Sequence, residues 1–251
     1  MGGMLRALVR VLSPVFEAIY PRRCVVCGDA GEMHPELPFC EACYDRLELF
    51  EDVTLCRRCA MPLDPLSDRE AGCNHCYRLP FGFDAACAAG PYSGTLREAI
   101  LAFKYRDRLV LAGFLADLAA GAAESAIERF RPQVICSIPP ARSRLYRRGY
   151  DPVALLAERV GRLTGIPYRG DLLVRVRDTR PLASMNRIQR MVELQGAFRS
   201  GRPLEGETIL LVDDIMTTGT TLSEAAGALK VAGAKRVLAV VVARTLALPP
   251  V

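Results

Sequence analysis

Apolar residues along this chain form short continuous runs that alternate with stretches of helical spacing. Residues 209–212 are four β-favouring apolar residues in a row, which predicts a strand buried on both faces. Two aspartates and a Thr/Gly turn follow this run, and apolar residues then recur at helical spacing up to Gly233. Glycine is common just beyond a helix end, so the pattern predicts a strand, a loop and a helix in that order.

The same alternation extends over residues 85–243. Further strands are predicted at residues 85–89, 134–138 and 237–243, and helices at residues 96–103, 110–129 and 152–164. Asp151 and Pro152 suit the N-cap and the first position of the last of these helices. Because strands alternate with helices, we expect an α/β fold with a parallel sheet whose ligands bind at the carboxyl ends of the strands.

The loop that follows residues 209–212 has the chemistry of a sugar phosphate site. Its residues are Asp213, Asp214, Thr217, Thr218, Gly219, Thr220 and Thr221. Backbone N–H groups at the start of the predicted helix attract a phosphate, and Gly219 allows its close approach. The two carboxylates suit a vicinal diol or the water shell of a magnesium ion, so the loop fits a ribose 5-phosphate. A strand that ends in solvated aspartates before a capped helix is the alternative.

The N-terminal segment, residues 1–23, carries apolar side chains on one helical face and predicts a short packing helix. A secretory signal is the alternative, but Arg6 and Arg10 interrupt the apolar run and a cysteine-rich region follows directly. No apolar run among the 251 residues reaches the ~18 residues that indicate a membrane span. We therefore expect a cytoplasmic protein without a membrane span.

Eight of the ten cysteines form four Cys-x-x-Cys pairs. They are Cys24 and Cys27, Cys40 and Cys43, Cys56 and Cys59, and Cys73 and Cys76. Twelve residues separate the first two pairs and thirteen the last two, which is the spacing of zinc ribbons with four thiolate ligands. Disulfides are the alternative, but they belong to oxidising compartments. We predict two structural zinc ions, held in the simplest case by sequential pairs, while the spacing leaves an interleaved arrangement open.

These motifs together resemble those of a known family. The stretch 212–221 resembles the phosphoribosyl pyrophosphate (PRPP) signature of type I phosphoribosyltransferases. With the cysteine pairs, the chain resembles the ComF family of competence proteins. Further marks are Leu101–Tyr105, Ile138–Arg142, Arg147–Tyr150, and Arg190 with Gly196–Phe198. The resemblance implies a small double zinc-ribbon module, with four cysteines at each zinc site, together with the N-terminal helix in residues 1–80. It also implies a parallel-sheet type I phosphoribosyltransferase domain in residues 81–251.

The resemblance also implies an activity. A phosphoribosyltransferase would move a ribosyl 5-phosphate from PRPP to a nucleophile and release pyrophosphate, with magnesium bound alongside PRPP. Asp213 and Asp214 would be the catalytic acids and would hold the ribose diol. The family pattern places Pro140, Ala141 and Arg142 on the pyrophosphate and brings Lys104 toward the site, although a surface lysine is an equal alternative for Lys104.

The family is linked to the handling of DNA taken up from outside, with single-stranded DNA and competence proteins such as a helicase as candidate partners. A factor that handles single-stranded DNA and binds PRPP as a regulator, without turnover, is therefore the alternative function. Residues 1–80 hold 9 Arg and 12 acidic residues, whereas residues 129–202 hold 16 Arg and 5 acidic residues. Because DNA is an anion, we expect any DNA contact at the arginines of residues 142–148.

Four positions depart from the family pattern. The family usually has asparagine or glutamine where this chain has Asp151, Pro152, Leu182 and Glu193. They lie in segments expected to line the acceptor side of the pocket, so the acceptor does not follow from the resemblance. Residues 178–189, which are polar and lack clear periodicity, are a candidate lid, with a plain surface loop as the alternative.

Overall fold

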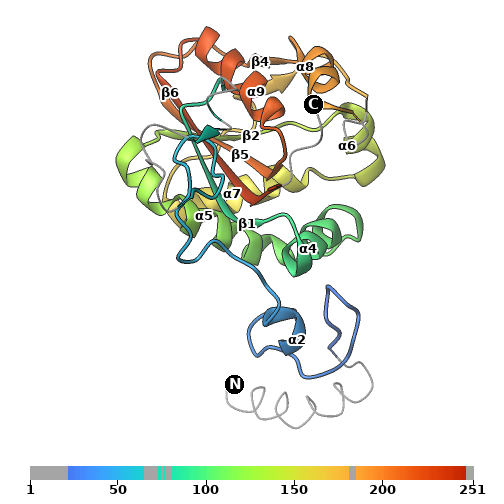
Figure 1. The fold of residues 1–251 in the computed structure, drawn as a ribbon. Helices are drawn as coiled ribbons and strands as arrows, with labels where there is room; N and C mark the ends of the chain where they lie inside the picture. The colour runs from blue at the N-terminus through green and yellow to red at the C-terminus, as the bar shows by residue number, and fades with distance from the viewer. Residues whose placement is uncertain (1–21, 65–72, 75, 77–80, 181–184, 247–251) are drawn as a thin grey trace, which may run out of the picture. The chain divides into compact units, whose positions relative to one another are not determined.

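The computed structural model describes residues 22–64, 73–74, 76, 81–180 and 185–246 (Figure 1). Packing divides the chain into two compact units, Met1–Leu47 and Glu48–Val251. The sequence-based boundary at residue 80 follows the end of the cysteine motifs, whereas packing assigns the second group of four cysteines to the larger unit. Nearly all of the predicted N-terminal helix lies outside the described residues.

The larger unit is built on a parallel sheet of four strands in the order β1-β6-β5-β2. The strands are β1 (Ala85–Pro91), β2 (Val134–Ser137), β5 (Thr208–Met216) and β6 (Arg236–Arg244). They coincide with the four predicted strands, and the parallel pairing confirms the predicted fold class. The predicted strand at residues 209–212 is longer in the structure, because β5 continues through Asp213 and Asp214 to Met216.

Helices cover both faces of this sheet (Figure 1). The longer ones are α4 (Gly94–Tyr105), α5 (Leu111–Phe130), α7 (Pro152–Thr164) and α9 (Thr220–Val231). Helix α5 contacts β1 and β6, and α7 contacts β2 and β5, on one face. On the other face Leu211 of β5 belongs to the same buried cluster as Leu222 and Leu229 of α9. Alternate strand residues therefore supply two cores, one for each face.

A smaller layer lies between β2 and β5 in the chain. It consists of α6 (Arg142–Arg148), β3 (Leu173–Arg175), α8 (Arg187–Leu194) and β4 (Phe198–Ser200), with β3 and β4 paired antiparallel. Helix α8 starts inside the candidate lid, where Asn186 and Gln189 form a capping box. Residues 181–184 of that segment lie outside the described residues. In the described part of the chain, no helix is both long and apolar enough to cross a bilayer.

Each compact unit contains one cluster of four cysteines. Cys24, Cys27, Cys40 and Cys43 form the first, and Cys56, Cys59, Cys73 and Cys76 form the second. Within each cluster all four sulfur atoms lie within 4.8 Å of one another, so the structure favours the sequential arrangement. The Cys59–Cys73 sulfurs are 3.4 Å apart and the Cys27–Cys40 sulfurs 3.7 Å apart. A disulfide needs about 2 Å, whereas four sulfurs around one zinc ion lie about 3.8 Å apart.

The two clusters fit two structural zinc ions, so the number of zinc ions per chain tests the assignment. We expect elemental analysis of freshly purified, reduced protein to find two zinc ions per chain. Cys43→Ser removes one thiolate from the first cluster and should lower the content toward one, because three-ligand sites hold zinc less tightly. Cys87 lies in β1 outside both clusters, so Cys87→Ser is the matched control and should keep two. One zinc ion or none in the unaltered protein would overturn the assignment.

Candidate active site

The signature loop joins the carboxyl end of β5 to α9. Gly219 is the N-cap residue of α9 and has a φ of +76°, a conformation that side chains other than glycine disfavour. A Cβ atom at this position would also lie 2.8 Å from the ring of Phe81. The hydroxyl groups of Thr218 and Thr220 are 2.8 Å apart, and both residues are buried. The sequence therefore fixes a tight turn lined with hydroxyl groups where the helix begins.

The two acids of the signature lie in different electrostatic surroundings. Asp214 is buried, and its Oδ2 lies 2.6 Å from Lys104 Nζ at the end of α4. Burial alone would lower the pKa of Lys104, but the charges of Asp214 and Asp213 outweigh it and raise the pKa. Asp213 Oδ1 accepts the Asp214 N–H at 2.9 Å. Burial and the neighbouring Asp214 charge raise the pKa of Asp213 well above its ordinary value.

The loop 139–142 follows β2, the strand that pairs with β5. Parallel strands present their carboxyl ends at the same edge of a sheet, so this loop and the signature loop share one edge. Ala141 is buried, whereas Pro140 is half-buried and Arg142 is exposed. The Arg142 N–H donates to Asp178 Oδ1 at 2.8 Å, so a carboxylate already engages this loop. An anion at the loop would replace Asp178 as the acceptor of that N–H.

Two arginines of the smaller layer reach this edge and were not predicted as site residues. Arg190 of α8 donates from Nη1 to Thr217 Oγ1 at 2.6 Å, so α8 contacts the signature loop directly. Arg175 of β3 is half-buried, and burial together with nearby Arg144 lowers its pKa to about 10, against the opposing charge of Asp213. In sequence, Arg190 was visible only as a family mark, and Arg175 had no signal of its own.

Three of the four departures from the family pattern have structural roles here. The Asp151 carboxylate caps α7 by accepting the Val153 and Ala154 N–H groups at 2.9 and 3.1 Å. Pro152 occupies the first helical position, as predicted. Glu193 accepts three hydrogen bonds from Arg180, one from its backbone and two from its guanidinium. Leu182, the fourth departure, lies outside the described residues.

A buried arginine connects the signature loop to the second cysteine cluster. Arg244, at the end of β6, has no exposed surface. Its guanidinium donates to the backbone carbonyls of Cys59 at 3.2 Å, Met216 at 3.0 Å and Thr245 at 3.0 Å, and to that of Thr217. Burial lowers the pKa of Arg244, and the thiols of the cysteine cluster partly oppose this shift. One side chain therefore holds both the cluster and the loop.

Comparisons with known proteins agree with both halves of this structure. A family model for the phosphoribosyl transferase domain matches residues 146–249, and a model for the double zinc ribbon domain matches residues 15–77. Among solved structures, a purine phosphoribosyltransferase from Pyrococcus horikoshii covers 53% of this chain and 84% of its own, with 18% identity and a TM-score of 0.30. That likeness is too slight to bear on the site.

Curated relatives span most of the chain. "Competence protein F" of Haemophilus influenzae is 26% identical over 222 residues, which cover 86% of this chain and 93% of the relative. "Competence protein ComFC" of Streptococcus pneumoniae is 26% identical over 86% of this chain and 96% of its own. "DNA utilization protein YhgH" of Escherichia coli is 28% identical over 78% of this chain and 86% of its own. With a double zinc ribbon followed by a phosphoribosyl transferase domain, the chain is similar over most of its length to these competence and DNA utilization proteins, which supports a protein of the ComF type.

Proposed function

We propose that the site at the carboxyl edge of the sheet binds PRPP and transfers its ribosyl 5-phosphate, with release of pyrophosphate. The observation that carries the proposal is the turn at Gly219, where backbone N–H groups and threonine hydroxyls converge beside two carboxylates. A 5-phosphate fits the N–H groups at the start of α9. The ribose diol fits the acids, and the pyrophosphate fits residues 140–142 at the same edge of the sheet.

Transfer breaks the bond between the anomeric carbon and the pyrophosphate oxygen, and the electron pair leaves with the pyrophosphate. The nucleophile supplies the pair for the new bond at the same carbon. Positive charge that develops on the ribose ring is stabilised by Asp213 and Asp214, and negative charge on the departing group by Arg142 and Lys104. Because these charges are fixed before reaction, the protein's task is positioning and electrostatic stabilisation.

Magnesium is the cofactor that this substrate would bring. When bound, it would neutralise negative charge on the leaving pyrophosphate. Asp213 is the carboxylate that suits it, because Asp214 is already engaged by Lys104 at 2.6 Å. A cation beside Asp213 would also relieve the repulsion from Asp214 that raises the pKa of Asp213.

A second candidate function is the binding of single-stranded DNA by a protein that uses PRPP as a regulator. Helix α6 favours it, because Tyr146 is 86% exposed and Arg147 beside it is exposed as well. Cations with an accessible aromatic ring are the usual surface for an unpaired strand. The name of the Escherichia coli relative states DNA utilization. Competence proteins such as a helicase remain an expectation from the family resemblance, and a cytoplasmic location remains an expectation from the sequence.

PRPP binding can be tested at two residues of the signature. Thr218→Val removes a hydroxyl group at constant shape and Asp213→Ala removes the proposed diol ligand. Each lost hydrogen bond to a charged or strongly polar group costs about 1.5–3 kcal/mol, so calorimetry with PRPP and magnesium should show affinity reduced about tenfold to a hundredfold for each bond that a variant loses. Thr164→Val, at the far end of α7, is the matched control and should bind normally. Unchanged affinity in both site variants would rule out this site.

Turnover separates the two candidate functions. We expect PRPP with the right acceptor to yield pyrophosphate, and Asp214→Asn, which removes the charge beside Lys104, to abolish that release. A panel of nucleobases and amines is the natural set of acceptors, because such nucleophiles need little activation. Tight PRPP binding without pyrophosphate release across the panel would favour the regulatory alternative.

DNA binding can be tested by charge reversal in α6. Arg144→Glu with Arg147→Glu should weaken the binding of single-stranded DNA and flatten its dependence on salt, because fewer counterions are released. Arg162→Glu, an exposed arginine of α7, is the control. Deletion of residues 1–47 should leave the binding intact. This deletion keeps Cys59, whose carbonyl Arg244 requires. If the deletion protein folds but no longer binds DNA, while the charge-reversal variant still binds it, the DNA contact lies in the first ribbon instead.

A further inference from the structure

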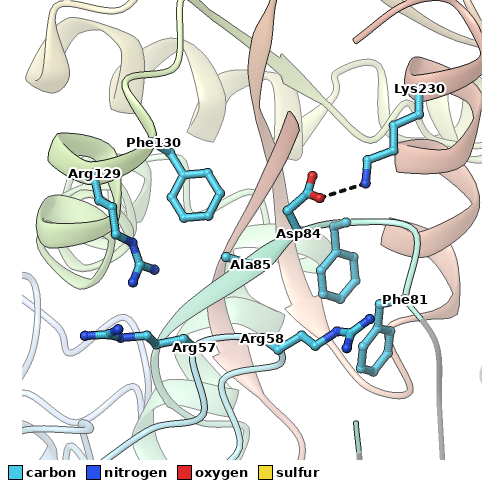
Figure 2. Close-up of a pocket in the computed structure, with 9 residues that line it drawn as sticks. Arg57, Arg58, Phe81, Asp84, Ala85, Arg129, Phe130 and Lys230 are labelled. Carbon is cyan, nitrogen blue, oxygen red and sulfur yellow. Dashed lines mark hydrogen bonds and ion pairs between the residues drawn. The ribbon is translucent and has the colours of Figure 1, made fainter. Parts of the chain in front are cut away.

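The second cysteine cluster is joined to the parallel sheet through its first pair of cysteines. Cys56 and Cys59 lie in a tight turn, in which the Ala60 N–H donates to the Cys56 carbonyl at 2.8 Å. Ala60 has no exposed surface and belongs to the hydrophobic core of the larger unit. The Ala86 N–H of β1 donates to the Arg57 carbonyl at 3.2 Å, so the turn lies against β1 (Figure 2). Two thiols of this cluster are therefore built into the sheet that carries the signature loop.

Arg244 provides a second link from this turn, and that link leads to the signature loop. The Arg244 guanidinium donates from Nε to the Cys59 carbonyl at 3.2 Å. From Nη1 it donates to the carbonyls of two successive residues, Met216 at 3.0 Å and Thr217. One end of the guanidinium thus engages the cysteine cluster, and another engages the first residues of the loop. Because the group is rigid and planar, its two ends move together.

These hydrogen bonds also set the direction of N–H groups in the loop. In a trans peptide the C=O and N–H bonds point in opposite directions, and the described residues contain no cis peptide bond. The carbonyls of Met216 and Thr217 point toward Arg244, so the N–H groups of Thr217 and Thr218 point away from it. Successive N–H groups on one side of a turn are the donors of anion-binding concavities. Arg244 therefore holds the backbone in a conformation that suits the proposed 5-phosphate site.

Burial makes the two ends of this link depend on each other. Arg244 has no exposed surface, so water does not replace a lost acceptor. If the turn at residues 56–60 moved, Nε would lose the Cys59 carbonyl, and the guanidinium would shift toward new acceptors. The loop carbonyls would then lose this donor, and the N–H groups of the same peptides would lose their orientation. Bound zinc would fix the turn, because two of the four thiolates, those of Cys56 and Cys59, lie in it.

We propose that Arg244 is a positioning residue for PRPP and that it makes PRPP binding depend on zinc in the second cysteine cluster. The inference rests on the proposed function, because it concerns the same phosphate loop. The four carbonyls that Arg244 engages all belong to the larger unit, which does not include the first cluster. The dependence is therefore specific to one of the two zinc sites. By thermodynamic linkage, PRPP must raise the zinc affinity of the second cluster by the same factor.

Two variants of the full chain, each lacking one zinc ligand, test this dependence. Cys73→Ser removes a thiolate from the second cluster and Cys43→Ser one from the first, so both should lower the zinc content toward one ion per chain. We expect calorimetry with PRPP and magnesium to show affinity for PRPP reduced about tenfold in Cys73→Ser, since coupled sites typically differ by about 5- to 150-fold. The affinity of Cys43→Ser for PRPP should be unchanged. Cys73 lies outside the turn at residues 56–60, so its loss acts on that turn through zinc.

The reverse effect is measured at equilibrium with a chelator that prefers zinc over magnesium. In Cys43→Ser only the second site keeps four thiolates, so competition with the chelator reads that site alone. PRPP should raise its zinc affinity about tenfold. In Cys73→Ser only the first site keeps four thiolates, and PRPP should leave its zinc affinity unchanged. The measurement on Cys43→Ser uses an intact second cluster, so it decides the question even if Cys73→Ser does not fold.

Arg244 itself is tested with a conservative variant in the Cys43→Ser background. Arg244→Lys keeps the charge but replaces the planar fork by a single ammonium group, which does not span both ends. PRPP should then no longer raise the zinc affinity of the second cluster. Arg236→Gln, at the opposite end of β6, is the matched control. It loses the hydrogen bond from Arg236 Nη2 to the Phe130 carbonyl at 3.2 Å and should keep the coupling.

The outcomes separate this inference from the proposed function. Equal PRPP affinity in Cys43→Ser and Cys73→Ser, or zinc affinity of the second cluster that PRPP does not change, would overturn the coupling and leave the proposed function standing. Coupling that is undiminished in Arg244→Lys would refute the role of this side chain. An unaltered chain that does not bind PRPP would overturn both proposals.

Discussion

The buried guanidinium of Arg244 is the constraint on which the arrangement of the larger unit depends. A charge without exposed surface is costly unless hydrogen bonds replace its water. Arg244 finds acceptors in the carbonyls of Cys59, Met216, Thr217 and Thr245. These carbonyls belong to the second cysteine cluster, the signature loop and the end of β6. Because one donor group serves all three, displacement of the cluster would leave part of a buried charge unsatisfied, and the loop would lose its support. The second cluster is therefore structurally part of the larger unit that holds the phosphoribosyl transferase domain.

At the candidate active site, on the carboxyl edge of the sheet, acidic side chains likewise depend on partners from other elements. Asp213 and Asp214 lie side by side, and their repulsion is offset by Lys104 from α4 and, at longer range, by Arg175 from β3. Arg190 adds a hydrogen bond to Thr217 from α8. Acids supplied by β5 thus meet cations supplied by three other elements. Under the proposed function, PRPP would exchange partners with these groups, since charges of both signs are already in place.

The sequence predicted those features that depend on residues close together in the chain. The four strands, the capped helix at Asp151 and Pro152, and the grouping of the cysteines follow from periodicity, capping and spacing, and all appear in the structure. The antiparallel pair of β3 and β4 was not predicted, because each strand has only three residues. The roles of Arg175, Arg190 and Arg244 depend on contacts between distant segments. In a chain with 33 lysines and arginines, composition gives no means of singling them out. The role of Glu193, which departs from the family pattern, likewise became clear only from its hydrogen bonds to Arg180.

The segment 81–84 ties the two edges of the sheet together. It runs along α9, where the Gly82 N–H donates to Ser223 Oγ at 2.7 Å and Asp84 pairs with Lys230. Phe81 packs so closely against Gly219 that a Cβ atom there would collide with its ring. A shift of the Phe81 ring would act on the turn through this contact, so the turn at Gly219 depends on a segment that precedes β1 and is held against α9.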